Sequence, residues 1–232
     1  MKIALVGDLH GNLPALEAMA REIVQIGADD IWFLGDAVGK GPSNPETCDW
    51  VMQNCSVCVG GNWDYGIGGR EYAADQYYWD QLGEERMRWL RSLPREAEMT
   101  MSGVRFRLFH GRPVTPLMMV THPRESMEAC FRTENGDFGG VIFADSHRPF
   151  VRTLNTGYIV NTGSVGNSIG INRAHALLLE GDLDSAEETS LRMTVLSVPY
   201  DIDRAVRMAA ESRNMPNRDA YITEITTGIY AR

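Results

Sequence analysis

The sequence lacks an excess of basic charge and has no long apolar run. Its 232 residues hold 22 Lys and Arg against 31 Asp and Glu, which gives a formal net charge of −9 and a pI near 5.1. Broad nucleic-acid binding needs a basic face, so we do not expect it. No segment is apolar enough to span a bilayer, and no signal-peptide pattern precedes the first apolar segment. We therefore expect a cytoplasmic protein without membrane contacts.

Cysteine is also scarce, with only Cys48, Cys55, Cys58 and Cys130. Cys55 and Cys58 have the C-x-x-C spacing of redox and zinc motifs. No second pair exists to complete a zinc site, and this pair leads into an apolar strand instead of opening a helix. We therefore expect the four cysteines to be small apolar core residues in a reducing compartment, and we favour this over a redox or zinc-binding role.

The length suits one α/β domain. We expect a single domain over residues 1–232, either undivided or with a small helical cap at about 66–94. Apolar periodicity predicts strands over 2–7, 31–35, 57–61, 97–109, 140–144, 150–154, 158–161, 174–179 and 190–197, and helices from Pro14, over 45–53 and over 202–212. A polar tail is expected to close the chain.

Five of these strands each end just before a side chain that can bind a metal. These side chains are Asp8 and His10, Asp36, Asn62 and Asp64, His110, and Asp145 and His147. Open α/β sheets bind ligands at the carboxyl ends of their strands, and an acid and an imidazole two residues apart can chelate one cation. Core packing alone would not produce this pattern, so we predict a metal site there.

The order of these motifs resembles that of the calcineurin-like metallophosphoesterases, in particular their small bacterial and archaeal phosphodiesterase branch. The family pattern is D-x-H, G-D, G-N-x-D, a lone H and G-H-x-H. This chain has Asp8-Leu9-His10, Gly35-Asp36, Gly61-Asn62-Trp63-Asp64, His110-Gly111 and Ala144-Asp145-Ser146-His147, with weaker similarities at 11–18, 39–42 and 160–166. The resemblance implies a four-layer α/β sandwich in which helices flank two mixed β-sheets.

The resemblance also implies two divalent or trivalent metal ions. The first ion would bind Asp8, His10, Asp36 and His147, and the second would bind Asp36, Asn62, His110 and Asp145. Asp36 would bridge the ions, and a hydroxide between them would attack phosphorus in line. This mixture of carboxylate, imidazole and amide ligands suits a transition metal. Mn or Fe is favoured, with Zn, Ni, Co or Mg as alternatives.

Two positions depart from the family pattern. Asp145 replaces a histidine of many relatives, which adds about one negative charge to the site by formal count and favours Mn or Fe over Zn. Trp63 replaces the histidine proposed to protonate the leaving group. Because indole has no titratable proton, and positioned proton donation is worth about 10²–10⁴-fold, we expect a preference for esters with acidic leaving groups.

The candidate catalytic residues are Asp36, as the bridging ligand, Asp64 and Arg112. Asp64 is the nearest alternative acid, although we favour a role in holding a ligand histidine. Arg112 could donate to a substrate phosphate or could equally be a surface charge, and Lys40 and Arg148 are weaker candidates.

Other motifs have structural interpretations. His122 and His175 are expected to be surface or structural histidines, and residues 66–69 are expected to form a glycine-rich turn that is not a P-loop.

The expected reaction is hydrolysis of a phosphodiester, a phosphomonoester or a nucleotide phosphoanhydride. Phosphoprotein phosphatase and dinucleoside polyphosphate hydrolase are alternatives, because relatives with similar motifs do both. A non-catalytic interaction scaffold is the third alternative, which Trp63 and Asp145 keep open. The expected partner is a small phosphate ester or nucleotide, with a homodimer suggested by the resemblance.

Overall fold

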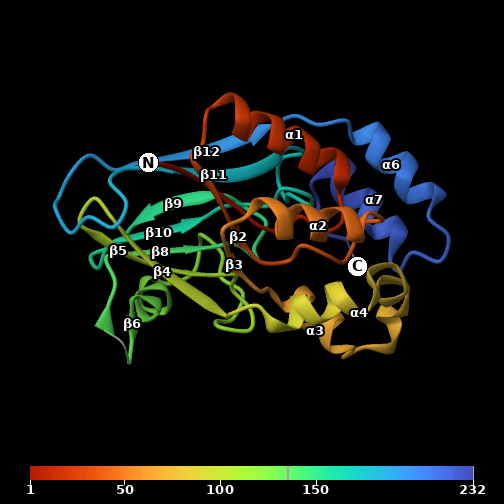
Figure 1. The fold of residues 1–232 in the computed structure, drawn as a ribbon, viewed down its shortest axis with the longest axis horizontal. Helices are drawn as coiled ribbons and strands as arrows, with labels where there is room; N and C mark the ends of the chain where they lie inside the picture. The colour runs from red at the N-terminus through yellow and green to blue at the C-terminus, as the bar shows by residue number, and fades with distance from the viewer. Residues whose placement is uncertain (135, 232) are drawn as a thin grey trace.

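Two five-stranded mixed β-sheets pack face to face in the computed structural model, which describes residues 1–134 and 136–231 (Figure 1). The first sheet has the strand order β12 (Arg192–Val198), β11 (Ala174–Glu180), β1 (Lys2–Val6), β2 (Asp30–Leu34) and β3 (Val57–Val59). Strands β1, β2 and β3 are parallel, and β11 pairs antiparallel with both β1 and β12. The carboxyl ends of β1, β2 and β3 therefore meet at one edge of this sheet.

The second sheet repeats this plan. Its strand order is β4 (Glu96–Met101), β5 (Val104–Phe109), β8 (Gly140–Phe143), β10 (Tyr158–Asn161) and β9 (Phe150–Thr153). Strands β5, β8 and β10 are parallel, whereas β4 and β9 are antiparallel edge strands. A separate two-stranded sheet joins β6 (Arg132–Thr133) and β7 (Gly136–Asp137).

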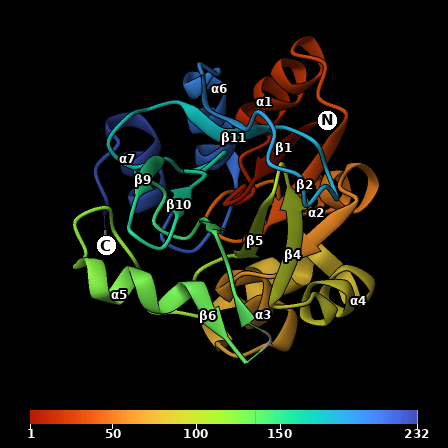
Figure 2. The same ribbon diagram turned by 90° about the vertical axis from the view of Figure 1, so that its left-hand side faces the viewer.

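Helices cover the outer faces of both sheets. The α-helices are α1 (Leu13–Gln25), α2 (Asn44–Asn54), α3 (Asn62–Gly69), α4 (Gln76–Ser92), α5 (Arg124–Glu128), α6 (Ile202–Glu211) and α7 (Arg218–Thr227), and short 3-10 helices are η1 (Ala73–Asp75) and η2 (Ala129–Phe131). Helix α1 packs on β11 and β12, and Figure 2 shows α5 on the opposite side of the molecule from α1 and α6. The predicted α/β sandwich of two mixed sheets flanked by helices is confirmed.

Strand β1 shows why the first apolar run forms a buried strand. Ile3 and Leu5 lie in the core between the two sheets, whereas Ala4 and Val6 lie in the core under the helices. Because both faces are buried, every position is apolar and no alternation with polar residues appears. The following helix begins where the Asn12 side chain accepts a hydrogen bond from the Ala15 N–H at 3.3 Å, as a helix N-cap does.

The structure corrects three expectations. The segment over 97–109 is a hairpin of β4 and β5, whose turn at Ser102 and Gly103 has positive φ.

Residues 66–69, the second correction, form the end of helix α3 instead of a turn. A Cβ atom at Gly68 would lie 2.9 Å from the Met87 carbonyl oxygen, so glycine here permits α3 and α4 to approach closely.

The polar tail contains a helix, which is the third correction. Helix α7 packs Tyr221 and Ile225 against Ala205 and Ala209 of α6. These two α7 residues are four apart and share one helix face. The helix has four apolar residues, Ala220, Tyr221, Ile222 and Ile225, and their spacing gives too weak a periodic signal to predict it.

Helix α4 belongs to the same core as the first sheet. Its Tyr78, Leu82 and Met87 join the cluster that contains Leu16 and Phe33. We therefore keep a single domain over residues 1–232 as our proposal, with the helices of 66–94 packed on the main core.

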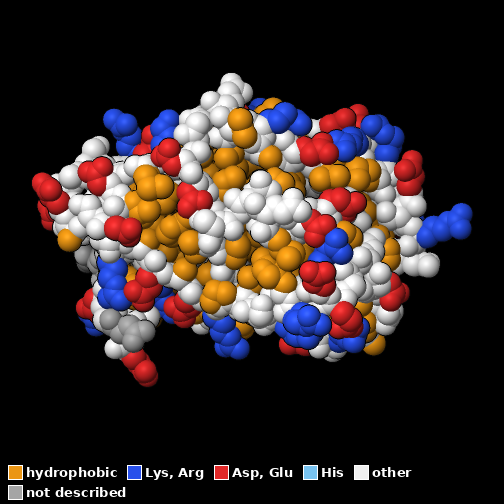
Figure 3. All heavy atoms as spheres, viewed as in Figure 1, with side chains coloured by type: hydrophobic (Ala, Val, Ile, Leu, Met, Phe, Trp, Pro, Cys, Tyr) orange, Lys and Arg blue, Asp and Glu red, His pale blue; other side chains and the backbone are white. Residues whose placement is uncertain are grey.

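The surface shows no sign of a basic stripe on the face drawn in Figure 3, where acidic and basic side chains alternate around apolar ones. Within the described residues, none of the helices has both the length and the apolar character needed to cross a bilayer.

Candidate metal centre

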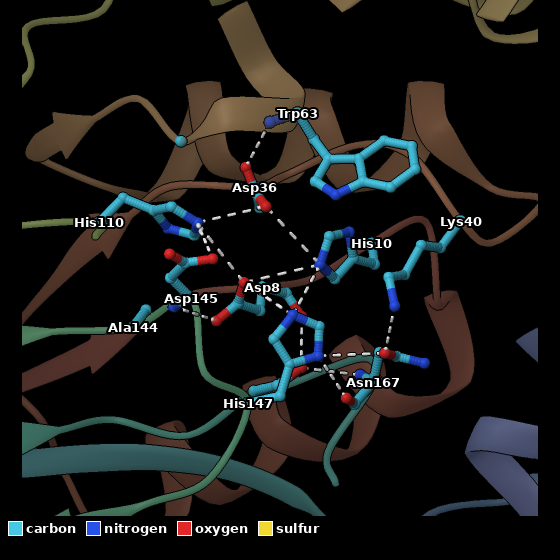
Figure 4. Close-up of polar contacts among 12 residues, drawn as sticks. Asp8, His10, Asp36, Lys40, Trp63, His110, Ala144, Asp145, His147 and Asn167 are labelled. Carbon is cyan, nitrogen blue, oxygen red and sulfur yellow. Dashed lines mark hydrogen bonds and ion pairs between the residues drawn. The ribbon is translucent and has the colours of Figure 1, made fainter. Parts of the chain in front are cut away.

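Four strand ends bring the predicted histidine and aspartate ligands to one place. Asp8 and His10 follow β1, Asp36 follows β2, His110 follows β5, and Asp145 and His147 follow β8. Figure 4 shows these side chains pointing toward one another from separate loops. Asp8, His10 and His110 are fully buried, and Asp36 is 1% exposed. The side chains that the sequence placed at strand ends therefore converge below the surface.

Most of these residues have a left-handed backbone. The φ angles are 52° at Asp8, 45° at His10, 60° at Asp36, 62° at Asp145 and 56° at His147. Positive φ is uncommon outside glycine, but Asp and His adopt it more readily than most residues. Such conformations cluster at functional sites, where the surrounding structure enforces them.

Backbone carbonyl groups orient all three imidazole rings. The Nδ1 atoms lie 3.2 Å from the Val38 oxygen in His10, 2.7 Å from the Leu34 oxygen in His110 and 2.6 Å from the Asn167 oxygen in His147. A carbonyl oxygen can only accept, so each Nδ1 carries the proton and donates it. Each Nε2 lone pair is then directed at the centre, as in metal-binding histidines.

The two buried carboxylates are held in a similar way. Asp8 Oδ2 accepts from the Asp145 N–H at 3.0 Å, and Asp36 Oδ1 accepts from the Trp63 N–H at 2.9 Å. The other oxygens, Asp8 Oδ1 and Asp36 Oδ2, face the histidines. One oxygen of each carboxylate therefore fixes its orientation, and the other can bind a cation.

The ligand atoms form two groups around shared carboxylates. In the first, Asp8 Oδ1 lies 3.2 Å from His147 Nε2 and 3.5 Å from His10 Nε2. In the second, His110 Nε2 lies 3.2 Å from Asp36 Oδ2 and 3.8 Å from Asp8 Oδ1. Within each group all candidate ligand atoms lie within 4.8 Å of one another. Asp8 belongs to both groups. Asp36 Oδ2 of the second group also lies 3.7 Å from His10 Nε2 of the first, so both carboxylates lie near histidines of both groups.

Buried polar atoms without partners show that the site fits metal ions. Asp8 Oδ1, Asn62 Oδ1 and His110 Nε2 are buried and have no hydrogen-bond partner. A buried polar atom left unsatisfied costs about 1–3 kcal/mol. Carboxylate, amide and imidazole atoms are metal ligands, so bound cations would satisfy these atoms.

The electrostatics also suit a cation. Burial opposes ionisation of Asp8, yet His147 and His110 hold its pKa well below the usual value. Burial lowers the pKa of His110, but the carboxylates of Asp36 and Asp8 outweigh this and raise it well above the usual value. The carboxylates therefore attract a positive charge at His110 Nε2, and a metal ion can take the place of that proton.

Asp145 pairs with Arg112, which corrects our estimate of the site's charge. Arg112 donates from Nη2 to Asp145 Oδ1 at 2.6 Å, and from Nε and its backbone N–H to Oδ2 at 3.0 Å each. His110 Nε2 lies 3.9 Å from Asp145 Oδ1. The negative charge that Asp145 adds is therefore offset by the guanidinium, and Asp145 lies at the edge of the two ligand groups.

Asp64 does not hold a ligand histidine, so that prediction was wrong. Its carboxylate accepts from the backbone N–H groups of Asp36 at 2.7 Å, Ala37 at 2.9 Å and Gly61 at 3.0 Å. Burial and the nearby Asp36 carboxylate raise the pKa of Asp64 to about 7. Asp64 thus fixes the backbone around Asp36, and the carbonyl of Leu34 orients His110 instead.

A cavity of about 590 Å³ opens above these ligands. Asp36, Asn62, Asp145 and His147 line it, and Lys40, Arg112 and Arg148 add positive charge to the lining. The apolar part of the lining includes Trp63, Tyr72, Ile169 and Tyr230. Small-molecule sites typically have volumes of about 300–1,000 Å³, so the cavity can hold a ligand much larger than one phosphate group.

Asn167 and Tyr230 were missed from the sequence. Asn167 accepts from His147, and Tyr230 lines the cavity from beyond α7. The motif at 160–166 was recognised, but Asn167 follows it directly and has no signature of its own. Tyr230 fell in the segment expected to be a polar tail.

The remaining predicted structural residues have local partners. His175 is 2% exposed and bonds to Ser168 and Ser197 through its two ring nitrogens. His122 accepts from the Met119 N–H at 2.9 Å. Cys48 and Cys130 are buried in apolar clusters, as expected for core residues, whereas Cys55 and Cys58 are only partly buried and pack against the first of these clusters.

Gly35→Ala is expected to disturb the His110 ligand. A Cβ atom there would lie 2.6 Å from His110 Nδ1, and φ is +92°. Backbone strain of this kind costs about 1–3 kcal/mol, and displacement of the imidazole should also weaken metal uptake. Calorimetric melting and titration of the metal-free protein with Mn²⁺ would measure the two effects.

Gly27→Ala is the matched control, because φ is +66° there and no atom lies within 4 Å of the added Cβ. It should lower the melting temperature without changing metal uptake. Equal metal binding by the two variants would contradict the steric role of Gly35.

Comparisons with known proteins agree with this geometry. Residues 1–184 match the family model of the calcineurin-like phosphoesterase superfamily domain. An uncharacterized protein of Methanocaldococcus jannaschii is 30% identical over 91% of this chain and 93% of its own length. The crystal structure of a metallophosphoesterase from Sphaerobacter thermophilus has a TM-score of 0.78 at 25% identity, and covers 99% of both chains. A symmetrical bis(5'-nucleosyl)-tetraphosphatase of Pseudomonas fluorescens is 39% identical over 62 residues, which are 25% of this chain and 21% of that protein.

Proposed function

Because the chain belongs to the calcineurin-like phosphoesterase superfamily, we propose that it hydrolyses a small phosphate ester or phosphoanhydride with two metal ions in the centre described above. One observation supports this most strongly. The Nε2 atoms of His10, His110 and His147 converge on the free oxygens of Asp8 and Asp36, while every Nδ1 is held by a backbone carbonyl. A site preorganised in this way suits metal binding.

The ligands are proposed to divide between the two ions. Asp8, His10 and His147 would hold the first ion and Asn62 and His110 the second, with Asp36 between them and Asp145 at the edge of the second site. When bound, two such ions activate water for in-line attack and neutralise the charge that develops on the phosphoryl oxygens. The residues themselves keep the ligand atoms oriented and the centre buried.

Cationic residues around the cavity would orient the phosphate group. Arg112 lines the cavity with its side chain 47% exposed, although its guanidinium already pairs with Asp145. A guanidinium has five N–H donors, so it can hold Asp145 and still donate to a substrate oxygen. We propose this dual role for Arg112.

The substrate is proposed to have an acidic leaving group. Trp63 lines the cavity and lies next to the ligand His10, with ring centroids 5.8 Å apart. It therefore occupies the place from which a proton donor could act, and indole cannot donate a titratable proton. Aryl esters, phosphoanhydrides and activated diesters need the least help from a general acid.

Dinucleoside polyphosphate hydrolysis is a second candidate. The local similarity to a bis(5'-nucleosyl)-tetraphosphatase supports it, and so does a cavity that holds more than one phosphate and includes aromatic side chains. The leaving group of such a substrate is a nucleotide phosphate, which is acidic.

Metal titration would test the proposed function against a non-catalytic scaffold. We expect the metal-free protein to bind about two equivalents of Mn²⁺ and then to hydrolyse bis(p-nitrophenyl) phosphate or a dinucleoside tetraphosphate. Activity with Mn²⁺ or Fe²⁺ should exceed that with Zn²⁺. Binding without hydrolysis of any ester or anhydride would favour the scaffold, and failure to bind metal would contradict the proposal.

A further inference from the structure

The C-terminal segment contacts a loop next to the candidate metal centre, although it lies outside the family match, which ends at residue 184. Glu224 of helix α7 is 3% exposed, and its Oε2 accepts from Lys40 Nζ at 2.8 Å. Its Oε1 accepts from the Ala231 N–H at 3.2 Å. The carboxylate therefore joins the end of the chain to the loop that follows the Asp36 ligand.

Lys40 continues this connection toward a metal ligand. Its ammonium also donates to Asn167 Oδ1 at 2.9 Å (Figure 4). The same Oδ1 lies 3.0 Å from His147 Nδ1, and the Asn167 carbonyl lies 2.6 Å from that nitrogen. A continuous set of contacts thus runs from α7 through Lys40 and Asn167 to the ring of His147.

The surroundings of Lys40 fix it in this position. Its side chain is 15% exposed, and the Tyr230 ring centroid lies 5.6 Å from Nζ. An ammonium has three donors, and Glu224 and Asn167 use two of them. Without Glu224, the positive charge would lose its carboxylate partner and would be free to move toward the acidic ligands, where it would repel a cation.

We propose that Glu224 is a positioning residue of the metal centre, acting through Lys40 and Asn167 on the orientation of His147. This inference rests on the proposed metal site. Helix α7 lies outside the family match, and by this inference it helps to determine the affinity for the ion bound by His147.

Glu224→Gln is expected to weaken binding of one metal ion by about tenfold, the lower end of the effect that groups orienting metal ligands usually have. The ion held by His110 should keep its affinity. Isothermal titration of the metal-free protein with Mn²⁺ would resolve the two affinities, and circular dichroism would verify that the variant is folded.

A double-mutant cycle separates positioning from a general loss of packing. Lys40→Met should weaken the same ion, and Glu224→Gln should have no further effect in the Lys40→Met background, because coupled residues are not additive. Glu17→Gln is the matched control. It removes the ion pair that joins α1 to Arg204 of α6, at 3.0 Å, so it loosens the C-terminal region elsewhere and should leave both affinities unchanged.

The outcomes distinguish this inference from the proposed function. If the wild type binds two ions and Glu224→Gln binds both with unchanged affinity, the inference is overturned and the proposed function stands. The same holds if the effects of Glu224→Gln and Lys40→Met on metal affinity are additive, or if Glu17→Gln loses as much affinity as Glu224→Gln. A wild type that binds no metal would overturn both. The inference would be supported if Glu224→Gln weakened the binding of one ion in the wild-type background and had no further effect in the Lys40→Met background.

Discussion

Asp36→Asn is expected to reduce phosphoesterase activity by about 10³-fold or more. Asparagine keeps the size of the side chain and can still accept the hydrogen bond from Trp63, but it removes the negative charge from an oxygen that lies near histidines of both ligand groups. Charge stabilisation by bound metal is worth several kcal/mol, and each 1.36 kcal/mol corresponds to about tenfold in rate. Steady-state hydrolysis of an aryl phosphodiester and metal content after dialysis would measure the loss.

Asp49→Asn is a suitable control for this variant. Asp49 forms an ion pair with Arg86 at 2.6 Å, and both side chains are about one third exposed. Surface pairs of this kind contribute about 0–1 kcal/mol, so activity and metal content should stay near those of the wild type. Retention of a tenth or more of the activity by Asp36→Asn would contradict a bridging role.

Trp63→His is expected to raise the hydrolysis of esters with poor leaving groups by about 10²-fold, the lower end of the effect of a positioned acid. The backbone N–H of residue 63 holds Asp36 whatever the side chain, so the ligand geometry should persist. An imidazole on this wall of the cavity could donate a proton that indole cannot. Esters of p-nitrophenol, whose leaving group needs no proton, should change little.

A series of phosphate esters with leaving groups of increasing pKa would measure this effect. The wild type should show a steep decline in kcat/KM along the series, and the variant a shallower one. Trp63→Phe is the control, because it removes the indole without adding an acid and should keep the steep decline. A wild-type rate that does not depend on the leaving group would refute the proposed role of Trp63.

The positions of the ligands could be predicted because they follow from local sequence. Each apolar run ends at a glycine or a polar residue, and parallel strands deliver their carboxyl ends to one edge of a sheet. Asp8 and Asp36 therefore needed no tertiary information to be placed together, whereas His110 follows a strand of the second sheet. The four-layer arrangement came from the family resemblance, because no local pattern says that a second sheet stacks on the first.

The partners of the ligands could not be predicted, because they come from distant segments. Glu224 is 184 positions from Lys40, and Asp145 is 33 from Arg112. Neither separation leaves a periodic signal. The error about Asp64 has the same origin: a buried carboxylate next to a ligand can hold an imidazole or a backbone N–H, and only the fold decides between them.

The positive φ angles at the candidate metal ligands restrict which residues can replace them. Aspartate, asparagine and histidine each have an atom that can coordinate a metal, and each tolerates positive φ. Substitutions among them can therefore alter the preference for one ion over another without changing the backbone conformation. Glutamate and cysteine also coordinate metals but lack that tolerance. Redesign of this protein for a different ion is therefore best confined to aspartate, asparagine and histidine, because glutamate or cysteine would strain the backbone at these positive-φ positions.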